Sequence, residues 1–435
     1  MNAEIRHIRT AAEQGLLDAF AAHRETLPSI AGERADAFRM FEEAGLPHRR
    51  VEEWKYTDLR ALMREAKPLA PKPDAAALAA AKGAGKLAGV KARRLVIVNG
   101  TFVPKLSDVA KLEPGLTIMS LADALGSGPV PELGRTVATK DVAVALNTAF
   151  MTDGVVIRVA DRAVIERPIQ LVFAYSGGAA AVFTRSLVTV GAGARLTLIE
   201  THEGPDGVDY QINNAIEVTV GDKAHVDRIK VGRDGGKALH LASLMARVGA
   251  EARFHDFAFT TGSAVTRNQL FVQLDGAGTH CGVRGATLLR GRQHVDTTMV
   301  IDHAAEGCES REVFKTVLDD ESRGVFQGKI IVRPGAQKTD GKMASHALLL
   351  SENAEADHKP ELEIFADDVQ CGHGATAGAL DQDLLFYLKT RGVPPKEAEA
   401  LLIQSFVGEA IEGIEHEALR EALSGLAEEW LQARV

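Results

Sequence analysis

The sequence predicts a mainly β protein, in which a β-solenoid lies between an N-terminal and a C-terminal helical domain. Apolar residues recur at helical spacing before about residue 64 and again after about residue 380. Between these stretches the apolar runs are short and end at Gly, Asp or Pro, which is typical of strands. A strand–turn–strand unit also repeats at a nearly constant interval. We therefore expect helical domains at 1–94 and 380–435 and a β-helix core at 95–379.

The N-terminal domain is predicted from two amphipathic stretches. In "TAAEQGLLDAFAAHR" and "ERADAFRMFEEAGLP" apolar residues recur at helical spacing, and Gly45 and Pro47 end the second stretch. Trp54 and Tyr56 follow close together, and we interpret them as anchors of this domain rather than as a stacking site. The segment 67–94 consists mostly of Ala, Lys, Gly and Pro, so we predict a mobile loop or a loose helix over the surface.

The β-region contains the repeat. "VGAGARLTL" starts at Val190, "VGDKAHVDR" at Val220, "VGAEARFHD" at Val248, and a degenerate copy, "LDGAGTHCG", at Leu274, so the intervals are 30, 28 and 26 residues. Each unit reads as a strand, a tight turn with glycine and an alternating strand. A β-sandwich would also give short strands with frequent turns. The near-regular interval favours a solenoid, in which each coil buries its inward face on the next.

The C-terminal domain is predicted to hold three helices. Asp381 is a suitable N-cap for the first helix and Gly392 a suitable stop. The second helix opens with the prolines of "PPKEAEALLIQSFVGEAIEGI", which suit a first helical turn. A closing helix is expected over about 416–433. The second helix carries an apolar stripe wider than one core contact usually needs, made of Leu402, Phe406 and Ala410 with Ile403, Val407 and Ile411.

Composition excludes several classes of function. The formal net charge is −9 without a clustered basic face, so we expect no nucleic-acid partner. No stretch approaches the roughly 20 apolar residues of a membrane span, and the charged N-terminus does not resemble a signal peptide. The three cysteines are well separated and do not form a disulfide framework. We therefore expect a reduced, cytoplasmic protein with no membrane segment, and, without a GxxxxGK[ST] motif, no ATP bound through a P-loop.

The stretch "VQCGHGATAG" places Cys371 two residues before His373. On an extended strand these residues share a face, so a thiol and an imidazole would stand side by side as two ligands of a soft or borderline metal. Two ligands do not close a tetrahedral site, and no CxxC or HxxxH motif lies nearby. The residues alone favour a structural pair, and they leave open half of a metal site completed from elsewhere.

Other reactive residues are interpreted structurally. Asp367 and Asp368 are adjacent, so on a strand they would face opposite ways, which suits a charged strand end better than an acid/base pair. "GCESR" is not a G-x-S-x-G elbow, so we do not expect hydrolysis. Cys281 is expected to be a buried thiol in a solenoid turn. The residues considered for a nucleophilic site are His303, Cys308, Ser310 and Lys315.

Several motifs together resemble one family. "GVFQGKIIVRPGAQKTD", "PELEIFADDVQCGHGATAG" and "LFYLKTRG" resemble the core of the SufB/SufD family of iron–sulfur cluster assembly proteins. The resemblance covers most of the chain and is weakest in 67–94. "PHRRVEEWKYTDL" and Gly374, which stands where SufB carries a glutamate, resemble the SufD branch. Gly372 departs from that branch, in which a serine is common.

The resemblance implies a right-handed parallel β-helix and a non-catalytic scaffold subunit that contributes to iron acquisition. It implies a complex with SufB through the β-helix and with two copies of the ATPase SufC through the helices at about 381–412. Carried over by residue, the interface ligands fall on Cys371 and His373, which would share a transient iron or iron–sulfur cluster with SufB. No cofactor is expected to be tightly bound to the isolated chain. The docking surface for SufC falls on the stripe of Leu402, Phe406 and Ala410.

Two alternatives remain beside this interpretation. One is a SufB-like principal cluster scaffold. A second, of a different class, is a β-helix polysaccharide lyase or hydrolase, which would need paired acids in a groove, whereas the acids here are dispersed. The resemblance also leaves open whether the isolated chain forms a homodimer.

Overall fold

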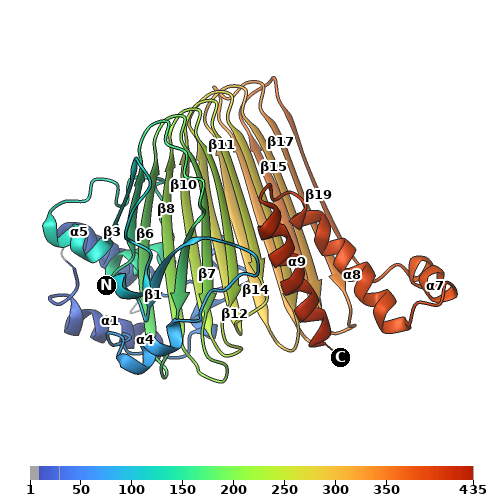
Figure 1. The fold of residues 1–435 in the computed structure, drawn as a ribbon, viewed down its shortest axis with the longest axis horizontal. Coiled ribbons are helices and arrows are strands. Elements are labelled where there is room, and N and C mark those ends of the chain that lie inside the picture. Colours follow the sequence, from blue (N-terminus) through green and yellow to red (C-terminus); the bar gives the residue numbers. More distant parts are fainter. Residues whose placement is uncertain (1–8, 29, 435) are drawn as a thin grey trace, which may run out of the picture.

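The computed structural model describes residues 9–28 and 30–434. The chain winds between two sheets, so that successive strands alternate from one sheet to the other and each pairs with the strand one coil earlier (Figure 1). All pairs are parallel except β1 with β2 and β3 with β4 at the N-terminal end. The first sheet contains β1 (Arg93–Val98), β2 (Thr101–Phe102), β5 (Ile169–Ala174), β7 (Arg195–Glu203), β9 (His225–Arg233), β11 (Arg253–Thr260), β13 (His280–Leu289), β15 (Glu309–Leu318), β17 (Asp340–Leu349) and β19 (Gln370–Gly378).

The second sheet faces the first across the interior of the solenoid. It contains β3 (Leu116–Ser120), β4 (Val155–Val159), β6 (Ala181–Val190), β8 (Gln211–Val220), β10 (Leu239–Val248), β12 (Val265–Leu274), β14 (His294–His303), β16 (Arg323–Val332) and β18 (Glu355–Ile364).

The copies of the sequence repeat occupy the same position in successive coils of the solenoid. Val190 is the register partner of Val220, Val220 of Val248, and Val248 of Leu274. The prediction of a β-solenoid is therefore confirmed, and the unequal intervals reflect turns of different length between strands that stay in register. A β-sandwich is excluded because the paired strands are parallel and one coil apart.

The interior between the two sheets forms the largest apolar core. On each strand every second residue points inward, because the side-chain period of a strand is two. On β9, for example, Val226 is buried in this core, and its register partner Phe254 on β11 is followed by Cys281 on β13. Cys281 is thus buried as the sequence predicts, but it lies on β13 and not in a turn as expected.

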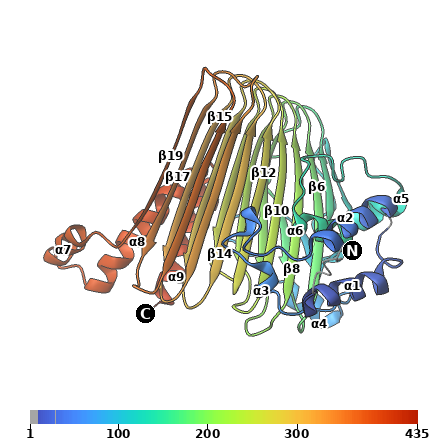
Figure 2. The same cartoon turned by 180° about the vertical axis from the view of Figure 1, so that it is seen from behind.

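Helices of the N-terminal part cover the second sheet on its outer face (Figure 2). They are α1 (Ala11–His23), α2 (Ala31–Ala44), α3 (Leu59–Leu62), α5 (Leu121–Ser127) and α6 (Val142–Phe150), with a short 3₁₀ turn η1 (Glu52–Trp54) between α2 and α3. A second 3₁₀ turn, η2 (Pro104–Leu106), follows β2. The Asn147 amide of α6 donates to the carbonyl oxygens of Thr184 and Asn213, so α6 is fixed to two neighbouring strands.

The low-complexity segment 67–94 has a defined course, whereas the sequence predicted a mobile loop or a loose helix. Leu69 bridges to Ala181 on the second sheet, and α4 (Ala75–Ala81) lies against β1 of the first sheet. Asp74 caps this helix by accepting from the amide of Ala77. The small side chains of Ala77 and Ala81 let the helix approach the sheet closely, and both are buried.

Three helices follow the solenoid: α7 (Gln382–Thr390), α8 (Pro395–Ile411) and α9 (Glu417–Gln432). α8 and α9 lie on the outer face of the first sheet, and α7 projects from the body (Figure 1). As predicted, Asp381 caps α7 with its carboxylate, and Gly392, at a φ of +89°, ends it. Within the described part of the chain, no helix combines the length and the apolar character that crossing a membrane requires.

Candidate functional site

The last coil of the solenoid is open. β18 pairs only with β16 and β19 only with β17, so each leaves one edge of backbone donors and acceptors unpaired by any described strand. Ile364 and Phe365, at the end of β18, are 41% and 62% exposed. Asp367 and Asp368 lie exposed in the turn that leads to β19, as suits a charged strand end.

Cys371 and His373 lie on β19, at this open edge. Their register partners on β17 are Gly341 and Met343, and Met343 is buried in the interior core. Because partners in parallel strands face the same side, Cys371 and His373 both point toward the interior side of the terminal coil. Cys371 is half-buried against the core, whereas His373 is exposed. The thiol and imidazole are therefore adjacent, on one face, and accessible from the open end.

The environment of Cys371 keeps its thiol protonated. Burial raises the pKa of Cys371 and outweighs a hydrogen bond from the Gly341 backbone that lowers it, and the nearby carboxylate of Asp340 acts in the same direction as burial. A thiol of raised pKa is a poor ligand until a metal displaces its proton. Cys371 alone is thus not poised to hold a metal, and a strong site here needs further ligands.

A buried acid lies behind the Cys371 and His373 pair. Glu312 on β15 is the register partner of Met343, two strands in from His373, and its side chain is fully buried. Burial raises the pKa of Glu312 to about 8. The carboxyl group is therefore largely protonated at neutral pH.

Charged residues also line the middle of the interior, which the sequence reasoning missed. The guanidinium of Arg228 lies 2.5 Å from a carboxylate oxygen of Glu200 and 2.5 Å from one of Asp256, and all three side chains are buried. Lys230 donates to Asn268, and burial lowers the pKa of this lysine to about 8. The sequence "HVDRIK" could have indicated these buried charges. Val226 faces inward, and Arg228 and Lys230 alternate with it along the strand, so they face inward too.

Three of the four residues considered for a nucleophilic site, His303, Cys308 and Ser310, lie inside the solenoid. Lys315 lies on the outer face, where its ammonium is 2.5 Å from a carboxylate oxygen of Glu409 on α8. The imidazole of His303 lies 3.0 Å from the hydroxyl of Ser310, and both side chains are fully buried. Burial also lowers the pKa of His303 to about 4. The Cys308 thiol donates to the carbonyl oxygen of Gly276 at 3.2 Å. Each of these groups thus has a structural partner, and none of them faces a groove for a polymer.

The stripe predicted on α8 divides between the core and the surface. Ala410 has no exposed surface and packs on the first sheet, so in this conformation it cannot contact a partner. Leu402 and Phe406 are half-buried, and the ammonium of Lys315 lies 4.6 Å from the Phe406 ring centroid. The exposed apolar side chains are instead Leu384, Phe386 and Tyr387 on α7 and Leu401 on α8, which are 52%, 66%, 54% and 43% exposed.

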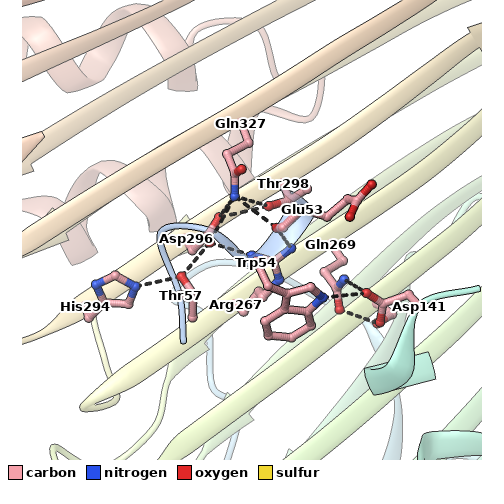
Figure 3. Close-up of polar contacts among 11 residues, drawn as sticks. Glu53, Trp54, Thr57, Asp141, Arg267, Gln269, His294, Asp296, Thr298 and Gln327 are labelled. Carbon is pink, nitrogen blue, oxygen red and sulfur yellow. Dashed lines mark hydrogen bonds and ion pairs between the residues drawn. The ribbon is translucent and has the colours of Figure 1, made fainter. Parts of the chain in front are cut away.

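The "VEEWKYTD" motif anchors the N-terminal part to the second sheet (Figure 3). The indole nitrogen of Trp54 donates to a carboxylate oxygen of Asp141 at 3.0 Å, and Trp54 is buried. The hydroxyl of Thr57 donates to Asp296 at 2.5 Å, and Arg267 donates to the carbonyl oxygen of Glu53 at 2.7 Å. The interpretation of Trp54 as an anchor is confirmed, because its contacts leave no face of the ring for a ligand.

Comparison with known proteins matches both parts of the chain. The family model described as "SUF system FeS cluster assembly, SufBD core domain" matches residues 173–406, and the one described as "SufBD protein N-terminal region" matches residues 11–171. The iron–sulfur cluster assembly protein SufD of Escherichia coli is 30% identical over 393 residues, which cover 87% of each chain. A SufBD family protein of Synechocystis is 31% identical over 400 residues, which cover 88% of this chain and 87% of that protein. SufD of Bacillus subtilis is 27% identical over 286 residues, or 65% of each chain.

Proposed function

The chain belongs to the SufB/SufD family of the SUF iron–sulfur cluster assembly system, and from this membership we propose that it is a SufD-type scaffold subunit without catalysis of its own. In this role it contributes to iron acquisition and to a cluster-forming interface with SufB. Gly374, in place of the glutamate expected after the histidine of SufB, supports the SufD assignment. Burial of two of the three cysteines supports it as well, because a principal scaffold needs accessible thiolates.

The observation that carries the proposal is the placement of Cys371 and His373 on an edge strand that has one free side. Iron–sulfur clusters generally need about four protein ligands, mainly thiolates. This chain supplies one thiol and one imidazole at that edge, so the remaining ligands come from SufB, which pairs with the open coil. The cluster or its iron is cargo shared between the two subunits and is passed on after assembly.

The second part of the proposal concerns the ATPase. Apolar side chains that project into solvent favour an interface, because their burial against a partner is worth about 25 cal/mol per Å². The projecting helix α7 presents three such side chains, and Leu402 and Phe406 continue this surface onto α8. We assign SufC docking to this surface, with Ala410 acting only as a support from within.

Co-expression with SufB and SufC tests the proposal. We expect one complex that contains this chain, SufB and two copies of SufC. Native mass spectrometry measures the mass of that complex and so its composition. Anaerobic reconstitution of the isolated chain with iron and sulfide should give no stoichiometric cluster by visible absorbance. A stable cluster on the isolated chain would instead support a SufB-like principal scaffold, and failure of any complex to form would reject both assignments.

A further inference from the structure

A second group of metal-ligating side chains lies where the C-terminal helices meet the first sheet. The turn between α8 and α9 passes over the outward face of β9, β11 and β13 and encloses a cavity of about 280 Å³. Asp227, His255 and His280 line this cavity from the sheet, and Glu415 lines it from the turn. The place is distinct from the open end, because β9 and β19 are five strand spacings apart, about 24 Å.

Two imidazoles and a carboxylate converge at one side of this cavity. One ring nitrogen of His225, one of His255 and one carboxylate oxygen of Glu415 all lie within 4.8 Å of one another. The two ring centroids are 5.5 Å apart, with the ring planes at 89°. Both histidines come from neighbouring strands, whereas Glu415 comes from the distant turn. Within residues 9–28 and 30–434 this is the one group of three such side chains at that spacing.

Asp227 holds the two imidazoles together. Its carboxylate oxygen lies 3.0 Å from Nδ1 of His255, its cross-strand neighbour, and 3.3 Å from Nε2 of His225. A carboxylate that contacts the ligating imidazoles orients the rings and raises their basicity, which is the common arrangement around protein-bound metals.

The turn that carries Glu415 approaches the sheet closely. A Cβ atom at Gly413 would fall 2.6 Å from Nε of Arg284 on β13, so glycine permits this approach. On the far side of the cluster, the guanidinium of the exposed Arg195 lies 3.2 Å from Nδ1 of His225, at the ring nitrogen that does not face Asp227, so an ion bound at this nitrogen displaces Arg195. The cluster is thus bounded by two cations, and its own net negative charge comes from Asp227 and Glu415.

We propose that His225, His255 and Glu415 bind one divalent transition-metal ion of the zinc or ferrous class, with Asp227 holding the two rings. Two imidazoles with one carboxylate are a donor set for Zn²⁺ and for Fe²⁺. Ca²⁺ and Mg²⁺ prefer ligand sets made of oxygen, so the two imidazoles disfavour them. Three protein ligands beside a cavity leave a coordination position open for water or a small exogenous ligand. Such an ion would join the C-terminal helices to the solenoid.

Metal titration of the full-length chain, stripped by a chelator, tests this site. Co²⁺ serves as a coloured probe for the binding geometry, and competition with Zn²⁺ and, without oxygen, with Fe²⁺ ranks the two ions. We expect one Co²⁺ per chain with weak visible bands and no thiolate charge-transfer band. His255→Ala and Glu415→Gln each remove a ligand and should weaken Co²⁺ binding by at least about 10-fold. Asp227→Asn should weaken it by about 10-fold to 100-fold. His280→Ala, at a histidine of the same cavity outside the cluster, is the matched control and should bind as the unaltered chain does.

A second measurement distinguishes loss of the metal site from misfolding of the variant. Glu415 is exposed, so Glu415→Gln should leave the melting temperature of the metal-free chain unchanged. X-ray absorption of the bound ion in the unaltered chain should report two imidazoles in its coordination sphere. Unchanged affinity in both His255→Ala and Glu415→Gln, or no binding by the unaltered chain, would overturn the proposal. Loss of the ion in a Cys371→Ser/His373→Ala chain would also overturn it, by placing the metal at the open edge, and would leave the scaffold function standing.

Discussion

The guanidinium of Arg267 stacks on the indole ring of Trp54, with its central carbon 3.9 Å from the ring centroid. Arg267 also lies 2.5 Å from a carboxylate oxygen of Asp296, and all three side chains are buried (Figure 3). A buried cation is tolerated only when it is paired and hydrogen-bonded, so the stack and the ion pair depend on each other. This stack is therefore one of the buried contacts that fix the N-terminal segment to the second sheet.

Trp54→Ala should release this contact. We expect a loss of about 3–5 kcal/mol, because the change leaves a cavity and exposes a buried charge pair to water. Limited proteolysis, followed by mass spectrometry, should show earlier cleavage before β1 than in the unaltered chain. Tyr56→Ala, at a half-buried aromatic of the same motif, is the control and should have a smaller effect. Equal protection of the Trp54→Ala chain would show that the other N-terminal helices hold the segment by themselves.

His373→Ala should lower the iron and acid-labile sulfide that co-purify with the assembled complex. The imidazole is exposed, so its removal costs little folding free energy, but the shared site loses one ligand. Cys371→Ser should give a milder loss if SufB supplies the main thiolates. His346→Ala is a suitable control, because this histidine lies on the neighbouring strand β17 but points to the opposite face from Met343. Full iron in His373→Ala complexes would reduce the histidine to a surface residue, and failed assembly would make its role structural.

Phe386→Asp should weaken SufC binding without unfolding the chain. The Phe386 side chain is 66% exposed on the projecting helix, so a charge there disturbs an interface and not the core. A loss of at least 10-fold in affinity is expected if Phe386 is one of the few large side chains that dominate such interfaces. Val164→Asp, at an apolar side chain that is 55% exposed far from α7, provides the control. Isothermal titration with SufC measures both, and equal affinities would place the docking surface elsewhere.

The double change Leu402→Ala/Phe406→Ala should behave differently from Phe386→Asp. Both side chains are half-buried, and Phe406 packs against the first sheet, so their truncation should lower the melting temperature as well as SufC affinity. Thermal unfolding beside the titration separates the two effects. A chain that melts earlier but binds SufC with unchanged affinity would assign this stripe to the core alone.

Glu312→Gln should change how stability depends on pH. The pKa of Glu312 is raised from 4.5 to about 8, so between these values the unfolded chain loses a proton that the folded chain keeps. The folded state therefore loses up to about 1.4 kcal/mol per pH unit through this window, and the loss ends above the folded pKa. Glutamine does not ionise, so the variant should show a flatter profile between about pH 5 and pH 8.

Denaturant unfolding at several pH values measures this slope. Glu309→Gln serves as the control, because Glu309 lies on the same strand with its side chain exposed. Parallel profiles for the unaltered chain and the Glu312→Gln chain would show that a water molecule or a rearrangement solvates the acid in the folded state.

The architecture could be predicted from the sequence because it is local and periodic. Val190 and Val220 mark the repeat, and the structure places them in register. Asp381 and Gly392 mark helix ends through their own side-chain and backbone preferences, so both predictions were confirmed. That Cys371 and His373 share a strand face could also be predicted, because strand residues two apart point the same way, whereas their role as ligands stays a prediction.

What the sequence did not reveal depends on long-range placement. Ala410 belongs to an apolar stripe, but only the packed helix decides which half of the stripe meets the sheet. The convergence of His225, His255 and Glu415 joins residues that lie far apart in the chain, and no spacing rule connects them. The path of 67–94 depends on a contact with β1, which follows the segment in the chain. The alanines of α4 pack against this strand, and no local pattern in the sequence indicates that contact.

The open last coil has a consequence for the supply of subunits. β18 and β19 offer ten and nine residues of strand edge, and backbone pairing does not distinguish one strand donor from another. Under the proposed pairing with SufB, self-pairing and pairing with SufB would compete by mass action, and the outcome would follow the relative amounts of the two chains. A cell that makes this chain in excess would then hold the surplus as self-paired molecules, whereas one that makes it in deficit would limit the number of complexes. The proposal thus links the yield of complexes to balanced translation of the two subunits.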